Sequence, residues 1–240
     1  MFKALKDKKS FLVTRNLVVA EIGYYLVFMA LALSMDWGNA YLEFPISKYL
    51  SFTVIEFTTL AVFQILLIVN VITRSIKEEQ DIKEVIRRGE HERLEFKTSL
   101  RWDVNKNQVN KDLERSAMKT ITAFLNSEGG SLILGLDDNG KVHGIESDCA
   151  SLVRNTHDGF ENHFNNLFVS MIGPEFRQHV KLSFHNISDK NISLIEVAPA
   201  HRPAYLKTDK GEDFFIRTGN ATTSLKVSQV SPYISSQWHR

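Results

Sequence analysis

Two apolar stretches near the N-terminus set the first part of the chain apart from the rest. Residues 22–35 and 57–73 carry no charged side chain. At a rise of about 1.5 Å per residue, about 20 residues cross a hydrocarbon core of about 30 Å. Both stretches are apolar on every face, which is unusual for helices of a small soluble domain. The pattern predicts two transmembrane helices, at about 13–35 and 53–73.

The charges that flank these stretches predict their orientation. Residues 1–16 hold five basic residues and one acidic residue, the loop 36–51 is slightly acidic, and the second stretch is followed by Arg74 and Lys77. Because basic flanks stay in the cytoplasm, we expect a cell (inner or plasma) membrane protein whose N-terminus and C-terminal part are both cytoplasmic. Buried core helices are the alternative interpretation of both stretches. A signal peptide is an alternative for the first, although no small-residue cleavage site follows it.

The remaining residues alternate between helical and strand periodicity, which predicts an α+β fold with a mixed sheet and flanking helices. Residues 77–89 are charged and continue the second helix as a stalk, and residues 84–240 form the domain. Apolar positions at helical spacing predict helices over Gln108–Asn126 and over Phe160–Met171. Strands are expected at 93–97, 131–136, 180–184, 192–197 and 214–217.

Composition narrows the possible functions. The single cysteine, Cys149, rules out an internal disulfide framework and a zinc site built on several thiolates. Residues 77–240 hold 22 basic and 23 acidic residues, so their net charge is −1. This balance argues against a strongly basic nucleic-acid coat protein, although it leaves room for a local basic patch.

Several short motifs follow one another in the domain. They are Glu-His-Glu-Arg-Leu-Glu-Phe-Lys at 90–97, Ala-Phe-Leu-Asn-Ser-Glu-Gly-Gly at 123–130, Leu-Gly-Leu-Asp-Asp-Asn-Gly at 134–140, Val-His-Gly at 142–144, Arg-Pro at 202–203 and Phe-Ile-Arg-Thr-Gly at 215–219. In this order they resemble a Schlafen AlbA-type domain, also called the divergent AlbA or AlbA-2 domain. The resemblance covers about residues 84–225 and says nothing about residues 1–76.

The resemblance implies either nucleic-acid binding alone or metal-dependent cleavage of RNA. Vertebrate Schlafens include endoribonucleases whose active site uses three acidic residues. Carried onto this chain, these residues are Glu90, Glu95 and Asp138, with Asp137 as an alternative for the third. Three convergent carboxylates would bind Mg²⁺ or Mn²⁺, which activates water or stabilises a leaving oxygen.

The spacing of the first two acids limits this hypothesis. Glu90 and Glu95 differ by an odd number, so on one regular strand they would point to opposite faces. Convergence therefore requires Glu90 on a turn and Glu95 on the strand. The alternative is that both are solvated acids among Arg87, Arg88 and Arg93.

Four basic residues are candidates for contacts with nucleic acid. Lys97 alternates with Glu95, so the two share a face, and Lys97 would hold a phosphate or form a salt bridge with Glu95. Arg93 belongs to a local basic patch, and Lys207 and Arg217 are expected to line the same groove. The expected partner is RNA rather than DNA.

Two functions from different classes follow. The first is a membrane-anchored, metal-dependent endoribonuclease acting on cytoplasmic RNA, in a defence or stress setting. The alternative is a non-catalytic nucleic-acid or nucleotide sensor coupled to a membrane-perturbing oligomer. Because the chain carries one copy of a module that vertebrate Schlafens use in pairs, a homo-oligomer is expected under either function.

Overall fold

The computed structural model describes residues 46–209 and 211–238, together with 19–20, 22–24, 26–27 and 30. The chain divides into two compact units, Met1–Glu78 and Glu79–Arg240. Each unit is described by itself below.

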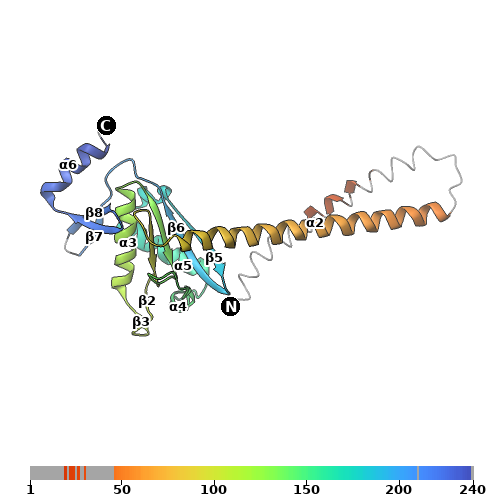
Figure 1. The fold of residues 1–240 in the computed structure, drawn as a ribbon, viewed down its shortest axis with the longest axis horizontal. Coiled ribbons are helices and arrows are strands. Elements are labelled where there is room, and N and C mark those ends of the chain that lie inside the picture. The colour runs from red at the N-terminus through yellow and green to blue at the C-terminus, as the bar shows by residue number, and fades with distance from the viewer. Residues whose placement is uncertain are drawn as a thin grey trace. The chain divides into compact units, whose positions relative to one another are not determined.

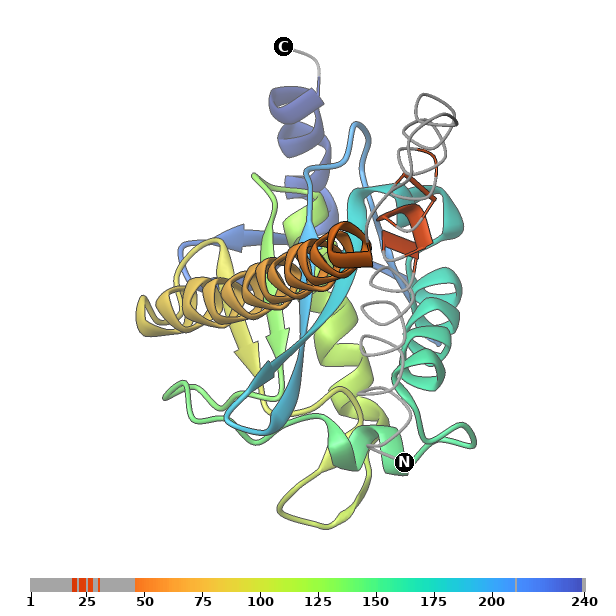
Figure 2. The same cartoon turned by 90° about the vertical axis from the view of Figure 1, so that its right-hand side faces the viewer.

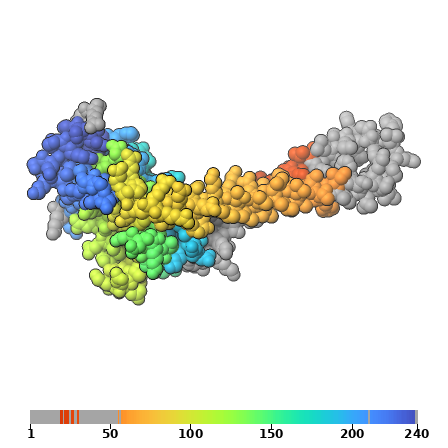
Figure 3. Space-filling model, in the orientation of Figure 1, coloured from red at the N-terminus to blue at the C-terminus, as the bar shows by residue number. Residues whose placement is uncertain are grey.

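The first unit is dominated by α2 (Ile46–Arg87), a continuous helix of 42 residues. Within the described residues, one helical segment, Phe57–Arg87, is long and apolar enough to cross a membrane by length and composition. Its large apolar side chains, such as Phe57 and Leu66, are exposed and form the outer surface of the helix (Figure 3). The hydroxyl group of Thr73 donates a hydrogen bond to the Val69 carbonyl at 2.7 Å, so this polar group is satisfied within the helix.

The predicted first membrane helix, 13–35, lies for the most part outside the described residues. Those of its residues that are described are helical. Among them, Tyr24 stacks on Phe63 of α2 with ring centroids 6.1 Å apart, and its hydroxyl group contacts Thr59. One candidate membrane helix is therefore found where the sequence predicted two, and the two-helix arrangement stays a prediction.

The second unit is built on a four-stranded sheet in the order β1-β4-β6-β5. Its strands are β1 (Leu94–Lys97), β4 (Gly130–Leu134), β5 (Val180–Ile187) and β6 (Lys190–Val197). β1 pairs with β4 in parallel, and the other pairs are antiparallel. β1 therefore lies at an edge of the sheet, with one side of its backbone unpaired by any strand described.

The two faces of this sheet pack against different helices (Figures 1 and 2). α3 (Lys111–Leu125) and α5 (His157–Met171) cover one face, where their side chains join Leu132 and Leu134 in the larger core. The last turns of α2 cover the other face, where Ile82 packs with Phe96 and Ile133. Alternation of side chains along β4 sends successive residues into the two cores.

Local sequence signals determine where α3 begins and ends. The Asn110 side chain accepts a hydrogen bond from Asp112 N at 3.0 Å, which caps the first turn. After the helix, Gly129 has φ of +75°, and a Cβ there would lie 2.6 Å from the Val197 carbonyl oxygen. Glycine is therefore required at the entry to β4.

A second, antiparallel sheet packs on α3. It contains β7 (Leu206–Thr208), β8 (Gly211–Thr218) and β9 (Ala221–Leu225), with β8 in the middle. The remaining elements are short: β2 (Trp102–Asp103), β3 (Gln108–Val109), α4 (Glu146–Ala150), the 3₁₀ helix η1 (Pro174–His179) and α6 (Val227–Trp238). Figure 1 shows α6 and β2–β3 in different parts of the unit.

Asn126 joins α3 to this second sheet. Its side chain is fully buried and makes hydrogen bonds with both backbone groups of Ala204 and with the Phe215 carbonyl, at 2.7 to 2.9 Å. The Asn126 carbonyl accepts a further hydrogen bond from the Tyr233 hydroxyl of α6 at 2.7 Å. One residue thereby connects the end of α3, the approach to β7, β8 and α6.

The sequence predicted the main strands and both long helices of this unit, and the α+β class is confirmed. The predicted helix over Gln108–Asn126 began too early, because Gln108 and Val109 form β3 and the cap is Asn110. The Asp-Asn-Gly sequence at 138–140 is typical of a hairpin turn, but in the structure it leads only into an isolated bridge between Leu136 and Val142. The short elements β2, β7, β9, α4 and α6 were not predicted.

We predict that Cys149 does not react with iodoacetamide in the folded protein at pH 8. Burial, followed by the neighbouring Asp148 and Glu146 carboxylates, raises the pKa of its thiol to about 12. The reactive thiolate is therefore a fraction of about 10⁻⁴ at that pH. Mass spectrometry of alkylated protein, native and in guanidinium chloride, should show modification only after unfolding. Fast labelling of the native chain would contradict this burial.

Candidate functional site

The predicted acidic residues lie around the edge strand β1. Glu95 is on β1 and Glu90 is on the turn before it, as convergence would require. Glu95 and Lys97 point to the same face, and Lys97 Nζ lies 3.2 Å from Glu95 Oε1. The side chains of Glu95 and Lys97 are 18% and 21% exposed. Lys97 therefore forms the salt bridge that was one of its two predicted interpretations.

The Glu90 carboxylate forms a hydrogen bond with the backbone of the edge strand β1. Its Oε1 accepts a hydrogen bond from Phe96 N at 2.7 Å. The turn places His91 opposite Leu94 as an isolated bridge, so the chain folds back beside β1. Glu90 thus satisfies an N–H group that no strand pairs, and a buried N–H without a partner is costly. The role that the structure gives to this carboxylate is structural.

The third predicted acid lies in the turn that follows β4. Asp138 is exposed, whereas its neighbour Asp137 is held by Asn139 N and Lys141 N, each at 3.0 Å, and by His143 Nε2, also at 3.0 Å. These contacts, with the His143 hydrogen bond the largest, lower the pKa of the Asp137 carboxyl.

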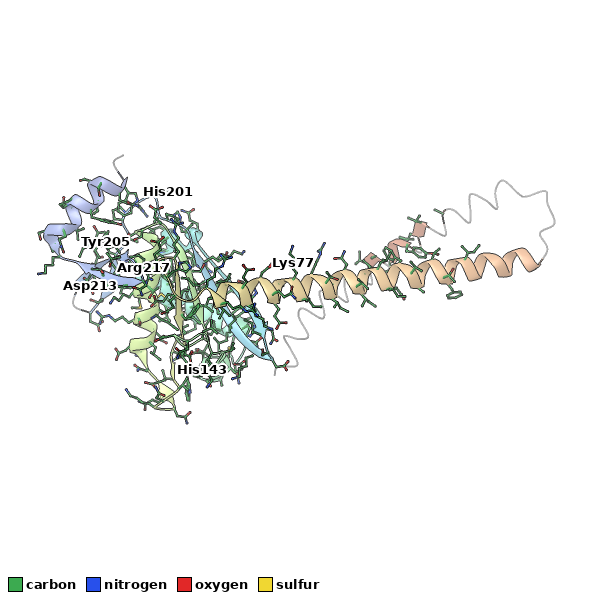
Figure 4. All side chains as sticks on the ribbon, in the orientation of Figure 1. Lys77, His143, His201, Tyr205, Asp213 and Arg217 are labelled. Carbon is green, nitrogen blue, oxygen red and sulfur yellow. The ribbon has the colours of Figure 1, made fainter. Side chains whose placement is uncertain are left out.

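The three predicted ligands do not come together in this structure. Among the residues that the structure describes, no group of three or more His, Cys, Asp and Glu side chains could hold a metal ion. Figure 4 labels His143, which marks the Asp137 turn, and Arg217, which contacts Glu95, in separate parts of the unit. The donor set of Glu90, Glu95 and Asp138 therefore does not fit a three-carboxylate metal site.

The second oxygen of Glu95 is bound to a buried arginine. Arg217 Nη1 donates to Glu95 Oε2 at 2.9 Å and to Thr222 Oγ1 at 3.1 Å. The Arg217 side chain is only 4% exposed, and its guanidinium carbon lies 5.0 Å from the centroid of the Phe124 ring. A charge in this position needs a close counter-charge, which Glu95 provides.

The remaining N–H groups of Arg217 donate to backbone carbonyls. Nε donates to Glu92 O at 3.2 Å, and Nη2 donates to His91 O at 3.2 Å and to Asn220 O at 3.0 Å. The guanidinium therefore connects the turn before β1 with the β8–β9 turn. Arg217 was predicted to contact nucleic acid, but its buried and fully bonded head group is not available to a phosphate.

The strand register places Lys207 and Arg217 on opposite faces of the three-stranded sheet. Lys207 on β7 is paired with Glu212 on β8, and directly paired residues share a face. Glu212 and Arg217 are five positions apart on the same strand, so they point to opposite faces. Arg93 is exposed and lies near two acids, Glu92 at 3.9 Å and Glu128 at 3.6 Å.

The structure reveals a basic stripe that the sequence analysis missed. Lys111, Arg115 and Lys119 recur every four residues along α3, and Lys111 and Arg115 are exposed. Within the described part of the chain, no carboxylate lies within 4.0 Å of the ammonium groups of Lys111 and Lys119, and the half-buried Lys119 lies over the Phe215 ring, 5.0 Å from its centroid. Arg115 lies 3.5 Å from Asp213, and both side chains are about half exposed. The four-residue spacing was the available signal, but the search for apolar positions passed over it.

Comparisons with known proteins match the second unit to one protein family. Residues 90–226 match the profile of the family described as Schlafen, AlbA_2. Among solved structures, the DIP2311 protein from Corynebacterium diphtheriae is similar, with 18% identity and a TM-score of 0.44 over 61% of this chain. This chain spans 24% of the length of that protein. The N-terminal domain of a protein from Nitrosomonas europaea, related to the ATP-dependent DNA helicase RecG, is similar at 21% identity. The TM-score there is 0.36, over 56% of this chain and 81% of that one.

We predict that Arg217→Lys lowers the free energy of unfolding of the second unit by about 3 kcal/mol. A lysine keeps the charge but cannot make the five hydrogen bonds of the guanidinium, and it leaves Glu95 partly unpaired. Urea unfolding followed by the fluorescence of the native tryptophans measures the change. Arg93→Lys, at an exposed position, is the matched control and should change stability by less than about 0.5 kcal/mol. Equal effects of the two substitutions would contradict the assigned role of Arg217.

We also predict that His143→Ala raises the pKa of the Asp137 carboxyl toward its ordinary value. The substitution removes the largest contact that lowers this pKa. With His143 present, the contribution of Asp137 to stability is complete above about pH 4 and is lost as the pH falls through the lowered pKa. Carboxyl carbon NMR titration reports the shift directly. His201→Ala, which removes an exposed histidine from another part of the unit, should leave this titration unchanged.

Proposed function

The chain belongs to the Schlafen AlbA_2 family, and from this membership we propose that it is a membrane-tethered, non-catalytic nucleic-acid-binding protein. The partner is RNA rather than DNA, and the contact surface is the basic stripe of α3 formed by Lys111, Arg115 and Lys119. The observation that carries the proposal is that two of these three ammonium or guanidinium groups have no carboxylate partner in the described part of the chain.

A stripe of this kind suits the phosphate backbone. Residues four apart on a helix lie on one side of it, so the three positive charges form a row. Phosphate contacts supply sequence-independent affinity, and each contact makes binding weaker as salt rises. The weak, half-exposed contact of Arg115 with Asp213 would compete little with a phosphate.

The near-neutral charge of the unit favours a local contact over coating of nucleic acid. Residues 77–240 carry a net charge of −1, so no long-range field draws polyanions to the whole surface. A row of three cations then supports moderate, salt-sensitive binding. This is the behaviour expected of a sensor rather than of a packaging protein.

The apolar stretch of α2 supports the tether. Residues 57–73 are free of charge, and their large side chains are exposed, which in water would be an unusually large apolar surface. We propose that this stretch spans the inner or plasma membrane, with a second span at 13–35, so that the domain lies in the cytoplasm. The lipid bilayer is then a second partner of the chain.

Metal-dependent cleavage of RNA is the second candidate function. It is favoured by one observation, namely that Glu95 lies on β1 and Glu90 accepts a hydrogen bond from Phe96 N of the same strand, so two of the three acids implied by the family lie at one strand. A defence role depends on that activity. The three acids do not form a metal-ligand group among the described residues.

We predict that Lys111→Gln combined with Arg115→Gln weakens binding of the full chain to fluorescein-labelled single-stranded RNA. The slope of log K against log salt should fall by about 2, because each lost phosphate contact removes about one unit. Anisotropy titrations of the detergent-solubilised protein at several salt concentrations measure both quantities.

The control for this test removes the same charge elsewhere. Lys181→Gln combined with Lys190→Gln changes the β5–β6 hairpin, where both side chains are exposed. This pair should bind RNA nearly as the wild type does. Equal losses in the two double variants, or a loss in neither, would refute the α3 surface.

The same RNA, incubated with Mn²⁺ or with EDTA, separates binding from cleavage. We expect intact RNA in both. Metal-dependent products that disappear in Asp138→Ala would overturn the non-catalytic proposal in favour of the second candidate. Asp138 is the suitable position because it is exposed, whereas a change at Glu95 would also unpair Arg217 and destabilise the fold.

A further inference from the structure

An open groove lies between α6 and the second sheet. Its volume is about 660 Å³, and its floor includes Phe214 of β8 and Leu225 of β9. One wall is the stripe of α6 at positions i, i+3 and i+7, formed by Val227, Val230 and Ile234. Val227 is exposed and Val230 and Ile234 are half-buried, so α6 presents a partly uncovered apolar face to the groove.

Two hydrogen bonds attach α6 to the unit. The Tyr233 hydroxyl donates to Asn126 O at 2.7 Å, and Trp238 Nε1 donates to Ala200 O at 2.9 Å. The rings of Tyr233 and Phe214 also meet edge to face, with centroids 5.9 Å apart. No residue of α6 is buried. These contacts attach α6 to the unit while its apolar stripe stays partly exposed.

The rim of the groove carries opposite charges. Lys226 and Glu212 are both exposed, and neither has an ion-pair partner within 4.0 Å in the part of the chain that the structure describes. Val227 at the mouth is 91% exposed, which makes it an apolar projection beside an apolar hollow. Figure 4 labels Tyr205 and Asp213, which also line the groove, next to α6.

We propose that this groove is the contact surface of a homodimer, in which a second copy of the chain packs its α6 stripe against the first. A surface that carries a projection, a hollow and both signs of charge is self-complementary, as a two-fold interface requires. Each copy brings the counter-charge that the other copy's rim lacks. The near-neutral charge of the unit adds no strong repulsion between copies.

A membrane tether would strengthen this contact. Confining the domains to one cytoplasmic surface makes their encounter nearly intramolecular, so a small apolar interface is sufficient. This inference extends the expected homo-oligomer to a defined surface, and the groove can be tested without nucleic acid.

The test compares two variants of the full chain in lipid nanodiscs, each with one cysteine added to the native Cys149. Val227→Cys places a thiol at the groove, and Val153→Cys places one at an equally exposed valine, 106% exposed, on the loop between α4 and α5. The native Cys149 is buried and should stay silent. Under copper–phenanthroline oxidation, Val227→Cys should form disulfide-linked dimers at least about tenfold faster than Val153→Cys.

A second substitution makes the result specific to the groove. Ile234→Glu introduces a charge into the apolar stripe and should abolish crosslinking of Val227→Cys, while circular dichroism shows an unchanged fold. Equal crosslinking of the two cysteines, or crosslinking that survives Ile234→Glu, would overturn the proposal. The proposal would also be overturned if the cysteine of Val227→Cys were protected from maleimide in a chain that stays monomeric. Another segment of the chain would then cover the groove.

Discussion

The buried guanidinium of Arg217 is the interaction on which the arrangement of the second unit depends. It lies against Phe124 of α3, pairs with Glu95 of β1, and donates to backbone carbonyls in the turns before β1 and after β8. The four-stranded and three-stranded sheets of the unit share no strand, so side chains such as Arg217 and Asn126 connect the three-stranded sheet to the rest of the unit. A charge placed there needs every one of these partners, because an unpaired buried charge costs several kcal/mol.

The hydrogen bonds and ion pairs of Glu90 and Glu95 limit the chemistry that these two acids can perform. One oxygen of Glu95 neutralises Arg217 and the other accepts from Lys97. Glu90 is bound to Phe96 N. A cation at this edge would have to displace a guanidinium that is already desolvated and hydrogen-bonded, which is a much poorer exchange than displacing water. Glu90 and Glu95, which suggest a metal site in the sequence, therefore stabilise the fold. On α3, by contrast, Lys111 is exposed and has no carboxylate within 4.0 Å among the described residues.

The sequence was a good guide where periodicity is long and a poor one where burial decides. The helix ending at Asn126 and the strands around Leu132 and Ile195 are continuous apolar patterns, and all were predicted. β7 contains only three residues, and β9, with the sequence Ala-Thr-Thr-Ser-Leu, has no apolar alternation by which it could be recognised. The role of Arg217 could not be predicted from the sequence, because the sequence pattern of a strand does not show whether an arginine on it faces solvent or a core. Its role depends on partners about 90 to 126 residues away in sequence.

A single domain with the α3 stripe would bind RNA weakly, and pairing through the α6 groove would strengthen the binding. Three cations on one helix can contact few phosphates, so one copy alone would bind weakly and lose most of its affinity at physiological salt. Pairing two domains doubles the number of contacts on one RNA strand, and the second set is engaged at high effective concentration. Affinity would then depend on the density of the protein in the membrane as well as on its sequence. A near-neutral domain with weak individual contacts is well suited to such dependence, because binding becomes appreciable only when copies are brought together.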